Sequence, residues 1–353
     1  MSTFPEVAVV GFAQSPQVRE TTGTTNGVEM LVPVFQRVLA ATGLSRREVG
    51  FWCSGSSDYL AGRAFSFVSA VDAIGALPPI AESHVESDAA WALYEAWVKI
   101  RTGEVDTALV YGFGKSSAGD LRRVLALQLD PYLVAPLWPD SVSIAALQAR
   151  LGIDAGLWSE KEMAEVAARS RADAAANPNA QLRDPVDPAA LLDTPYLADP
   201  LRAHDCAPIT DGAAAIVLAA GHRARELCER PAWITGLEHR VDSPALGARD
   251  LTRAPSAGAA AAAAGIDGVQ VAELATPFTS QELLLRRELG LADDVVINPS
   301  GGPLCGNPMF AGGLVRIGEA ASRVLDGGAQ RVLGHASNGP LLQQNLICVM
   351  EGR

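Results

Sequence analysis

The sequence predicts an α/β fold built from two similar halves with a helical insertion between them. Short β-rich segments alternate with longer helical ones along the chain, which is the pattern of a layered α/β protein. Three strand-like segments of the first half return in the second half, in the same order and about 220–225 residues later. A long-period duplication of this kind sets the architecture, because each half then repeats one structural plan.

The repeated strands form three pairs, and the segments before them are alike as well. Helical stretches precede the second and third strands of each half and end in glycine, a residue that commonly terminates helices. The pairs are "VAVVGFAQS" at Val7 with "AWITGLEHR" at Ala232, "EVGFWCSGSSD" at Glu48 with "VQVAELATPFTS" at Val269, and "DTALVYGFGKSS" at Asp106 with "QRVLGHASNG" at Gln330.

The division into halves places four segments along the chain. Residues 1–115 form the N-terminal half and residues 231–353 the C-terminal half. Residues 116–205 are rich in Pro, Asp and Leu, and we interpret them as an inserted helical loop domain. Residues 206–230 then supply a strand and a helix that return to the N-terminal half.

One helix is well marked within the insertion, in "SEKEMAEVAARSRADAAA". Ser159 fits the N-cap position, and Glu162 three residues later completes a capping box. The alternative to a helical domain is an extended connector that carries this one helix.

Composition and charge exclude several classes of protein. The chain is 48% apolar and 19% charged, a composition typical of globular proteins. Its 353 residues are enough for two domain-sized cores. No apolar run approaches the roughly 18 residues of a membrane-spanning helix, and the N-terminus has no features of a secretory signal. The net charge of −12 argues against nucleic acid and anionic membranes as partners. The five cysteines are scattered without CxxC spacing, so we expect a cytoplasmic protein with no metal site.

Three glycine-rich or alanine-rich segments carry a resemblance to a known family. They are "DCAPITDGAAAIVLAA" at residues 205–220, "INPSGGPLCGNPMFAGG" from Ile297 and "GHASNGP" from Gly334. In this order they resemble the motifs of the thiolase superfamily, above all the sterol-carrier-protein-type thiolases and their lipid-transfer relatives. The resemblance covers nearly the whole chain. It implies a thiolase fold, a five-layer αβαβα sandwich made of two βαβαβ-type halves with the loop domain inserted.

Thiolases cleave or form a C–C bond next to a thioester with residues from four loops. A cysteine at a helix N-terminus takes up the acyl group, and a histidine in a "GHP" sequence activates it. The same histidine, with an Asn or His from a preceding loop, stabilises the thioester enolate. A last loop supplies an acid or base.

This sequence departs from the thiolase pattern at three of those loops. Where the nucleophilic cysteine is expected, the chain has Glu86, Ser87 and Asp88. Ala275 stands at the expected Asn or His of the preceding loop, and Asn307 replaces the histidine of "GHP". Acyl transfer through a cysteine is therefore not expected.

Four residues remain as candidates for catalysis. Asn307 is predicted to donate to a thioester carbonyl, or else is a loop amide that satisfies backbone groups. Asp88 and Glu86 are predicted as a base, although Asp88 also suits an N-cap. His335, in the final loop, is predicted as acid or base, or else as a structural histidine bonded to backbone. Cys305, taken as the thiol nearest to the site, is expected to pack as a small apolar residue.

Coenzyme A is expected as part of the substrate, with no covalently bound cofactor. Lys115 and Ser116 follow a predicted strand and are candidates to contact a coenzyme A phosphate, the alternative being a solvated strand end. The glycine-rich loops add Gly301, Gly302 and Gly339 to the predicted coenzyme A contacts.

Among thiolase-like lipid-transfer proteins, the resemblance points to aldolases that shorten a sterol side chain. Retro-aldol cleavage of a β-hydroxyacyl-CoA needs a base and donors for the thioester enolate, but no acyl-enzyme. Those aldolases work with a small zinc-ribbon/OB-fold partner that resembles an acyl-CoA-binding subunit. They are thought to use tyrosines near the site, and this chain departs from them because its last two motif loops have none. Its tyrosines are Tyr59, Tyr94, Tyr111, Tyr132 and Tyr196.

Two other functions remain open. We expect the chain to form a homodimer or a heteromer with a second thiolase-like chain. One alternative is a non-catalytic subunit that pairs with an active thiolase-like chain, because such a subunit would also lack the catalytic loops. It is alternatively a protein that binds an acyl-CoA or a sterol without chemistry.

Overall fold

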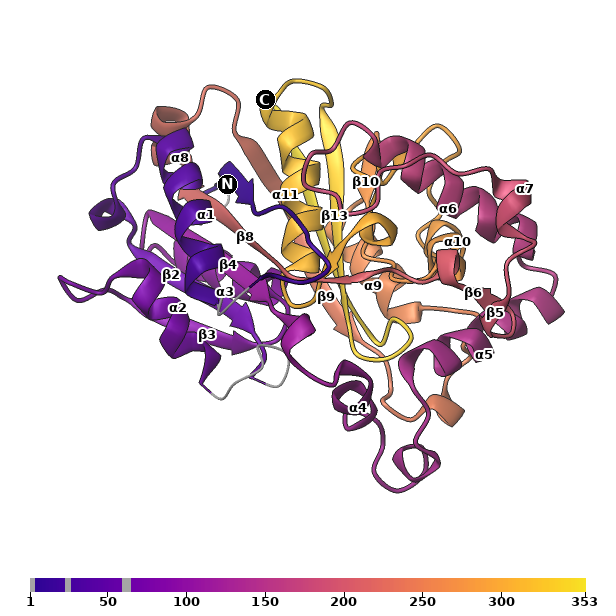
Figure 1. Cartoon of the computed structure of the whole chain (residues 1–353). Helices are drawn as coiled ribbons and strands as arrows, with labels where there is room; N and C mark the ends of the chain where they lie inside the picture. The colour runs from indigo at the N-terminus through magenta and orange to yellow at the C-terminus, as the bar shows by residue number, and fades with distance from the viewer. Residues whose placement is uncertain (1–3, 23–26, 59–64) are drawn as a thin grey trace.

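The computed structural model describes residues 4–22, 27–58 and 65–353. Tyr59 lies outside the described residues. Two sets of five strands lie edge to edge in a ten-stranded sheet of order β11-β10-β13-β14-β9-β1-β8-β4-β2-β3. The two sets are joined by a short antiparallel contact, in which Ala8 pairs with Trp233 and Val9 with Ala232. Figure 1 shows the indigo first half and the orange-to-yellow second half on either side of this contact.

The first half contributes five strands in the order β3-β2-β4-β8-β1. Its last strand, β8, lies between β1 and β4, although the insertion separates it from β4 in sequence. The elements are β1 (Val7–Gln14), α1 (Gly27–Thr42), β2 (Phe51–Ser56), α2 (Ser66–Ile74), β3 (Glu82–Glu86), α3 (Ala89–Arg101), β4 (Thr107–Gly114), β8 (Gly212–Ala220) and α8 (Gly221–Leu227).

The second half repeats this plan, with strand order β11-β10-β13-β14-β9. If the strands of each half are numbered along the chain, both orders read 3-2-4-5-1, so the predicted duplication is confirmed. The elements are β9 (Ala232–Val241), α9 (Pro255–Ala264), β10 (Val271–Glu273), α10 (Thr279–Glu288), β11 (Val296–Ile297), β12 (Asn307–Pro308), α11 (Gly312–Leu325), β13 (Arg331–Asn338) and β14 (Gln344–Glu351).

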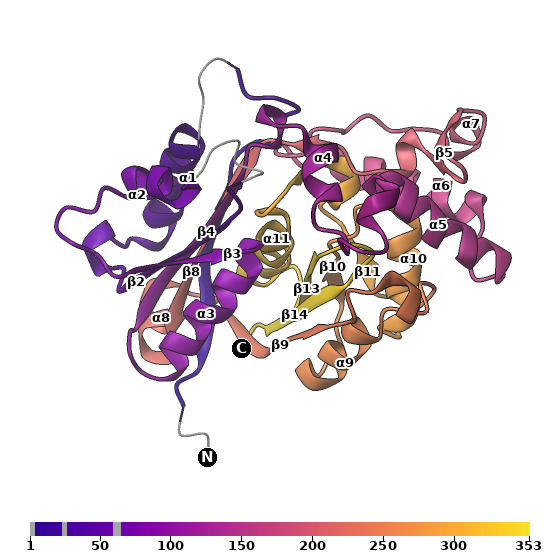
Figure 2. The same ribbon diagram turned by 90° about the horizontal axis from the view of Figure 1, so that it is seen from below.

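The helices form three layers around the two sets of strands. Helices α3 and α11 lie in the middle and bury apolar residues of both halves in one core. Figure 2 shows α11 between the strands of the two halves. Helices α1 and α2 cover the outer face of the first half, and α9 and α10 that of the second. Close packing in the middle depends on glycine: a Cβ at Gly55 would lie 2.4 Å from the Ala89 Cα, and one at Gly334 2.6 Å from the Ile317 Cα. The predicted five-layer αβαβα sandwich is confirmed.

The insertion between β4 and β8 is helical rather than an extended connector. Its helix α6 (Glu160–Ala174) begins after Ser159, and Glu162 completes the predicted capping box. The insertion also contains three helices that were not predicted from the sequence, α4 (Leu121–Ala126), α5 (Ser141–Asp154) and α7 (Pro188–Leu191). The short strands β5 (Tyr196–Ala198), β6 (Leu201–Arg202) and β7 (Ile209–Thr210) follow.

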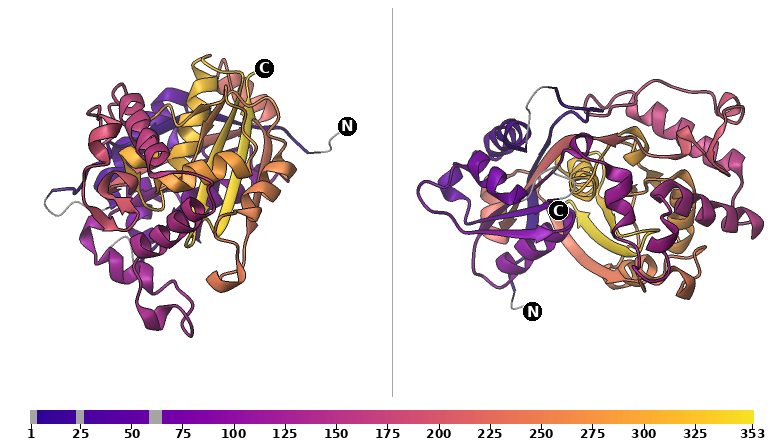
Figure 3. Two further views of the ribbon diagram at one scale, coloured as in Figure 1. Left: turned by 90° about the vertical axis from the view of Figure 1, so that its right-hand side faces the viewer. Right: turned by 60° about the horizontal axis from the view of Figure 1, so that its bottom comes forward.

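Polar contacts fasten this insertion to the second half. Arg169 of α6 donates to both carboxylate oxygens of the buried Glu282 on α10, and the Gln281 amide donates to Gln148 of α5. Figure 3 shows the magenta insertion against the orange second half in two views. Among the helices of the described ranges, none combines the length and apolar character that crossing a bilayer requires.

Candidate functional site

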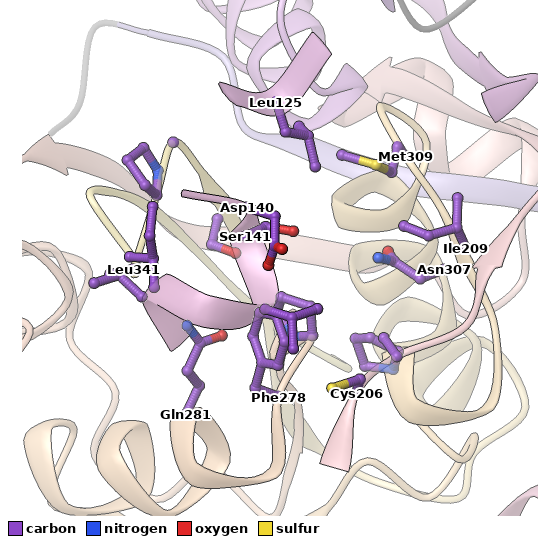
Figure 4. Close-up of a pocket in the computed structure, with 18 of the residues that line it drawn as sticks. Leu125, Asp140, Ser141, Cys206, Ile209, Phe278, Gln281, Asn307, Met309 and Leu341 are labelled. Atoms are coloured by element: carbon purple, nitrogen blue, oxygen red, sulfur yellow. The ribbon is translucent and has the colours of Figure 1, made fainter. Parts of the chain in front are cut away.

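A cavity of about 590 Å³ opens where the two central helices begin and the insertion folds over them. Its volume lies within the range of small-molecule sites. Figure 4 shows residues of the insertion, of the α11 loop and of α10 around it. The wall is mostly apolar, with Leu121, Leu125, Leu129, Val142, Ile144, Leu197, Ile209, Phe278, Met309, Leu341 and Leu342.

Asp88 lies in the cavity wall, at the N-termini of both central helices. It caps α3, with Oδ1 accepting from the Ala90 N–H at 2.9 Å. The same carboxylate accepts from the Gly313 N–H at 2.9 Å and the Leu314 N–H at 3.2 Å, at the start of α11. Burial raises the pKa of the Asp88 carboxyl, while these three N–H groups act to lower it. Two further N–H groups in the first turn of α3 bind carbonyls, that of Ala89 the Phe310 carbonyl and that of Trp91 the Asp88 carbonyl.

Asn307 also lies in the cavity wall. It begins β12, which pairs in parallel with β7 of the insertion, so that Asn307 lies opposite Ile209. Its side-chain amide forms no hydrogen bond to any residue that the structure describes, and Figure 4 shows it directed into the cavity. An amide held by its backbone but free at its tip is able to bind a ligand carbonyl. Among the described residues, the amide makes none of the backbone contacts that the alternative, a loop amide, would make, so it is available to a ligand.

His335 is fully buried on β13 and is not part of the cavity wall. Its Nδ1 accepts from the Ala275 N–H at 3.2 Å, and its Nε2 lies 2.9 Å from Asn345 Oδ1, an arrangement that suits the neutral Nε2–H tautomer. Burial lowers the pKa of His335 to about 4. Neighbouring strand residues face opposite sides, and Ala336 faces the central helices while His335 faces the layer of α9. These contacts are those of the alternative, a structural histidine bonded to backbone.

Three further predicted residues lie away from the cavity wall. Glu86 is exposed at the end of β3, 3.6 Å from the His84 ring. Lys115 Nζ donates to Thr21 Oγ1 at 2.7 Å, and Ser116 is buried beside it at the end of β4.

Of the three predicted glycines, Gly339 lines the cavity and the other two do not. Gly301 has φ +95°, and a Cβ there would lie 2.5 Å from the Ala174 Cβ. Gly302 has φ +62°, and a Cβ there would lie 2.8 Å from Asn298 Nδ2. Both positions therefore need glycine for the close approach of neighbouring segments.

Two charged groups of the wall belong to no sequence motif. Asp140 and its ion-pair partner Arg122 line the cavity from the insertion. The only signal for Asp140 was local, since "PDS" before an apolar-periodic stretch marks a helix N-cap. The cavity thiol is Cys206, not Cys305, and burial raises its pKa to about 12. Cys305 packs against Ala174 as the small apolar residue that was predicted.

The described residues contain no group of three or more His, Cys, Asp or Glu side chains placed to hold a metal ion. Of the described tyrosines, Tyr111 is buried in the first half, and Tyr132 and Tyr196 are exposed on the insertion.

Comparison with known proteins places the chain near the thiolases. No family model matches it. An acetyl-CoA acetyltransferase of Methanothermobacter thermautotrophicus is 27% identical, over 71% of this chain and 75% of its own length. The acetyl-CoA acetyltransferase of Methanocaldococcus jannaschii is also 27% identical, over 69% of this chain and 70% of its own.

Solved structures match along the whole chain. The Ltp2-ChsH2(DUF35) aldolase has a TM-score of 0.80 at 19% identity, with 98% of each chain covered. Human mitochondrial 3-ketoacyl-CoA thiolase has a TM-score of 0.78 at 16% identity, with 99% of each chain covered. The Bacillus anthracis acetyl-CoA acetyltransferase has a TM-score of 0.80 at 17% identity, with 100% of each covered. With its duplicated sheet order, the chain thus has the fold of the thiolase superfamily.

Proposed function

We propose that the protein is a carbon–carbon lyase that cleaves β-hydroxyacyl-CoA thioesters by a retro-aldol reaction. The observation that carries this proposal is Asp88. A carboxylate with both oxygens bound by backbone N–H groups stands where the thiolase resemblance places the nucleophilic cysteine. A carboxylate so held is a poor nucleophile toward a thioester, whereas retro-aldol cleavage needs no covalent intermediate.

Asn307 supplies the donor that this reaction requires. As the C–C bond breaks, negative charge develops on the thioester oxygen, and an N–H donor directed at that oxygen stabilises the charge. The Asn307 amide is directed into the cavity and has no competing hydrogen bond among the described residues.

The apolar side chains of the cavity wall suit a substrate with a bulky apolar acyl group. Leucine side chains reach it from the insertion (Leu121, Leu125, Leu129) and from the final loop (Leu341, Leu342). An alicyclic ketone of the kind released in sterol side-chain degradation would bury its surface against these residues. Coenzyme A enters as part of the substrate, with Gly339 as the predicted contact that lies in the wall.

We also propose that the protein acts together with a partner chain. The name of the similar aldolase pairs Ltp2 with ChsH2(DUF35). We expect this chain to act in the cytoplasm, as a homodimer or as a heteromer with a second thiolase-like chain, and with a small zinc-ribbon/OB-fold protein that binds acyl-CoA.

The alternative function is that of a non-catalytic subunit beside an active thiolase-like chain. The same Asp88 favours it, because the N–H groups at the start of both central helices are occupied by Asp88 and Phe310. A helix N-terminus whose N–H groups already bind a carboxylate stabilises a substrate anion only weakly.

Product analysis by mass spectrometry separates the two functions. The protein, alone and with any chain that co-purifies, is mixed with a panel of β-hydroxyacyl-CoA and β-ketoacyl-CoA thioesters without free coenzyme A. Release of a ketone and a shortened acyl-CoA from a β-hydroxy substrate supports the lyase. Turnover that needs a cysteine-bearing partner, and persists when Asn307 is replaced by Ala, supports the non-catalytic subunit and overturns the lyase.

A further inference from the structure

The retro-aldol reaction needs a base, and the cavity wall contains one that the motifs did not indicate. Asp140 ends the loop before α5, and its Oδ1 caps that helix by accepting from the Ser143 N–H at 2.8 Å. Its Oδ2 forms an ion pair with Arg122 of α4. Figure 4 shows the Asp140 carboxylate directed into the cavity, as is the Asn307 amide.

The other protonatable groups of the described wall are less suited to accept a proton. Asp88 is the second acidic residue there, and its oxygens accept from three backbone N–H groups, whereas Asp140 accepts from one and pairs with the exposed Arg122. Cys206 is a thiol whose pKa is raised to about 12 by burial and by the charges of Asp205 and Asp140, so it stays protonated. His335 is outside the wall, with both ring nitrogens engaged.

Asp140 is held in its ionised form. Burial acts to raise the pKa of its carboxyl, but the Ser143 N–H and Arg122 outweigh burial and leave the pKa below its ordinary value. Arg122 is the charged group that faces Asp140, from α4, and 78% of its side chain is exposed, so solvent weakens the pair. The neighbouring Cys206 thiol is neutral. A carboxylate of this kind is ionised at neutral pH but is a weak base, and its protonated form returns the proton readily to the product.

We propose that Asp140 is the catalytic base, opposite Asn307 as the thioester donor; this role rests on the retro-aldol function proposed above. The Asp140 carboxylate takes the proton of the β-hydroxyl group. The bond between the α and β carbons breaks, the β carbon becomes the carbonyl of a ketone, and the electron pair passes to the thioester enolate, whose oxygen Asn307 binds. The protonated Asp140 then returns its proton to the α carbon, which completes the shortened acyl-CoA without any other reactant.

The replacement Asp140→Asn tests this role without removing the helix cap. Asparagine caps helices as well as aspartate does, so α5 keeps its first turn while the base is lost. The probe is a β-hydroxyacyl-CoA whose β carbon lies in a cyclopentane or decalin ring, with the shortened acyl-CoA measured by mass spectrometry. We expect kcat to fall by about 10²- to 10⁴-fold with little change in KM. The matched control is Asp187→Asn, because Asp187 is an exposed N-cap on α7, outside the cavity wall.

Arg122 provides a second readout that a purely structural role for Asp140 would not change. Removing its charge in Arg122→Gln raises the pKa of Asp140, so the acid limb of the kcat/KM profile moves to higher pH, and Arg122→Lys restores it. An unchanged limb in Arg122→Gln, or Asp140→Asn with wild-type kcat, overturns the role of Asp140 and leaves the lyase standing. If the wild-type protein cleaves no β-hydroxyacyl-CoA, alone or with its partner, the lyase and the role of Asp140 both fail.

Discussion

The Asp88 carboxylate accepts a hydrogen bond from the Gly313 N–H at 2.9 Å, across 225 residues of sequence. This separation equals the offset between the first strands of the two halves, β1 at Val7 and β9 at Ala232. The two residues lie at the N-termini of α3 and α11, with Asp88 as the N-cap of α3 and Gly313 as the second residue of α11. The duplication brings the N-termini of the two helices together, and the Asp88 carboxylate accepts hydrogen bonds from both of them.

Replacing Asp88 with Ala should destabilise the protein markedly. It removes the cap of α3 and leaves three buried N–H groups without an acceptor, for which we expect a loss of about 2–4 kcal/mol in the free energy of unfolding. Urea denaturation of the two proteins at neutral pH measures the difference. Asp187→Ala, at an exposed cap, is the control and should cost about 1 kcal/mol or less. Equal losses in the two variants would show that the link between the central helices adds no stability.

Replacing Asn307 with Ala should reduce turnover and spare the fold. Its amide has no hydrogen-bond partner among the described residues, so we expect the free energy of unfolding to change by no more than about 0.5 kcal/mol. Loss of an enolate donor should lower kcat by about 10²- to 10³-fold on a β-hydroxyacyl-CoA substrate. Gln36→Ala, on the exposed side of α1, is the control. A destabilised variant with full turnover would instead identify Asn307 as a structural loop residue.

His335 should make stability depend on pH. Its pKa is lowered to about 4 in the folded protein, against about 6.5 in an unfolded chain. The unfolded state thus binds the extra proton first, so stability is complete above about pH 6.5 and falls by about 3 kcal/mol as the pH drops toward 4. Denaturation at pH 7.5, 6 and 5 measures this slope. It should be smaller in His335→Asn and unchanged in His222→Gln, because His222 is exposed; a slope that survives in His335→Asn would refute the assignment.

Gly301 should tolerate no side chain, for structural reasons. Alanine there needs both a positive φ and a Cβ 2.5 Å from the Ala174 Cβ, so we expect Gly301→Ala to destabilise by about 2–4 kcal/mol. Gly247→Ala is the control, since it has open space and no positive φ, and should be neutral or slightly stabilising. If Gly301→Ala keeps its stability and loses affinity for coenzyme A, the predicted coenzyme A contact is the better interpretation.

The sequence by itself determined the layered architecture. The alternation of β-rich and helical segments, the glycines after helices and the Ser159–Glu162 capping box are local signals. Each predicts its element without knowledge of the rest of the fold. The repeat at 220–225 residues then required both halves to have the same strand order, which they do.

Only the tertiary structure decided which motif residues reach the cavity. His335 and Ala336 are neighbours on β13, and successive side chains of a strand point to opposite faces. Ala336 therefore faces the central helices and His335 faces away from them, a difference that a shift of one residue along the strand would reverse. Asp140 belongs to no motif and comes from a different segment than Asn307. The two line one cavity because the insertion folds back over the start of α11, a long-range arrangement that no local pattern encodes.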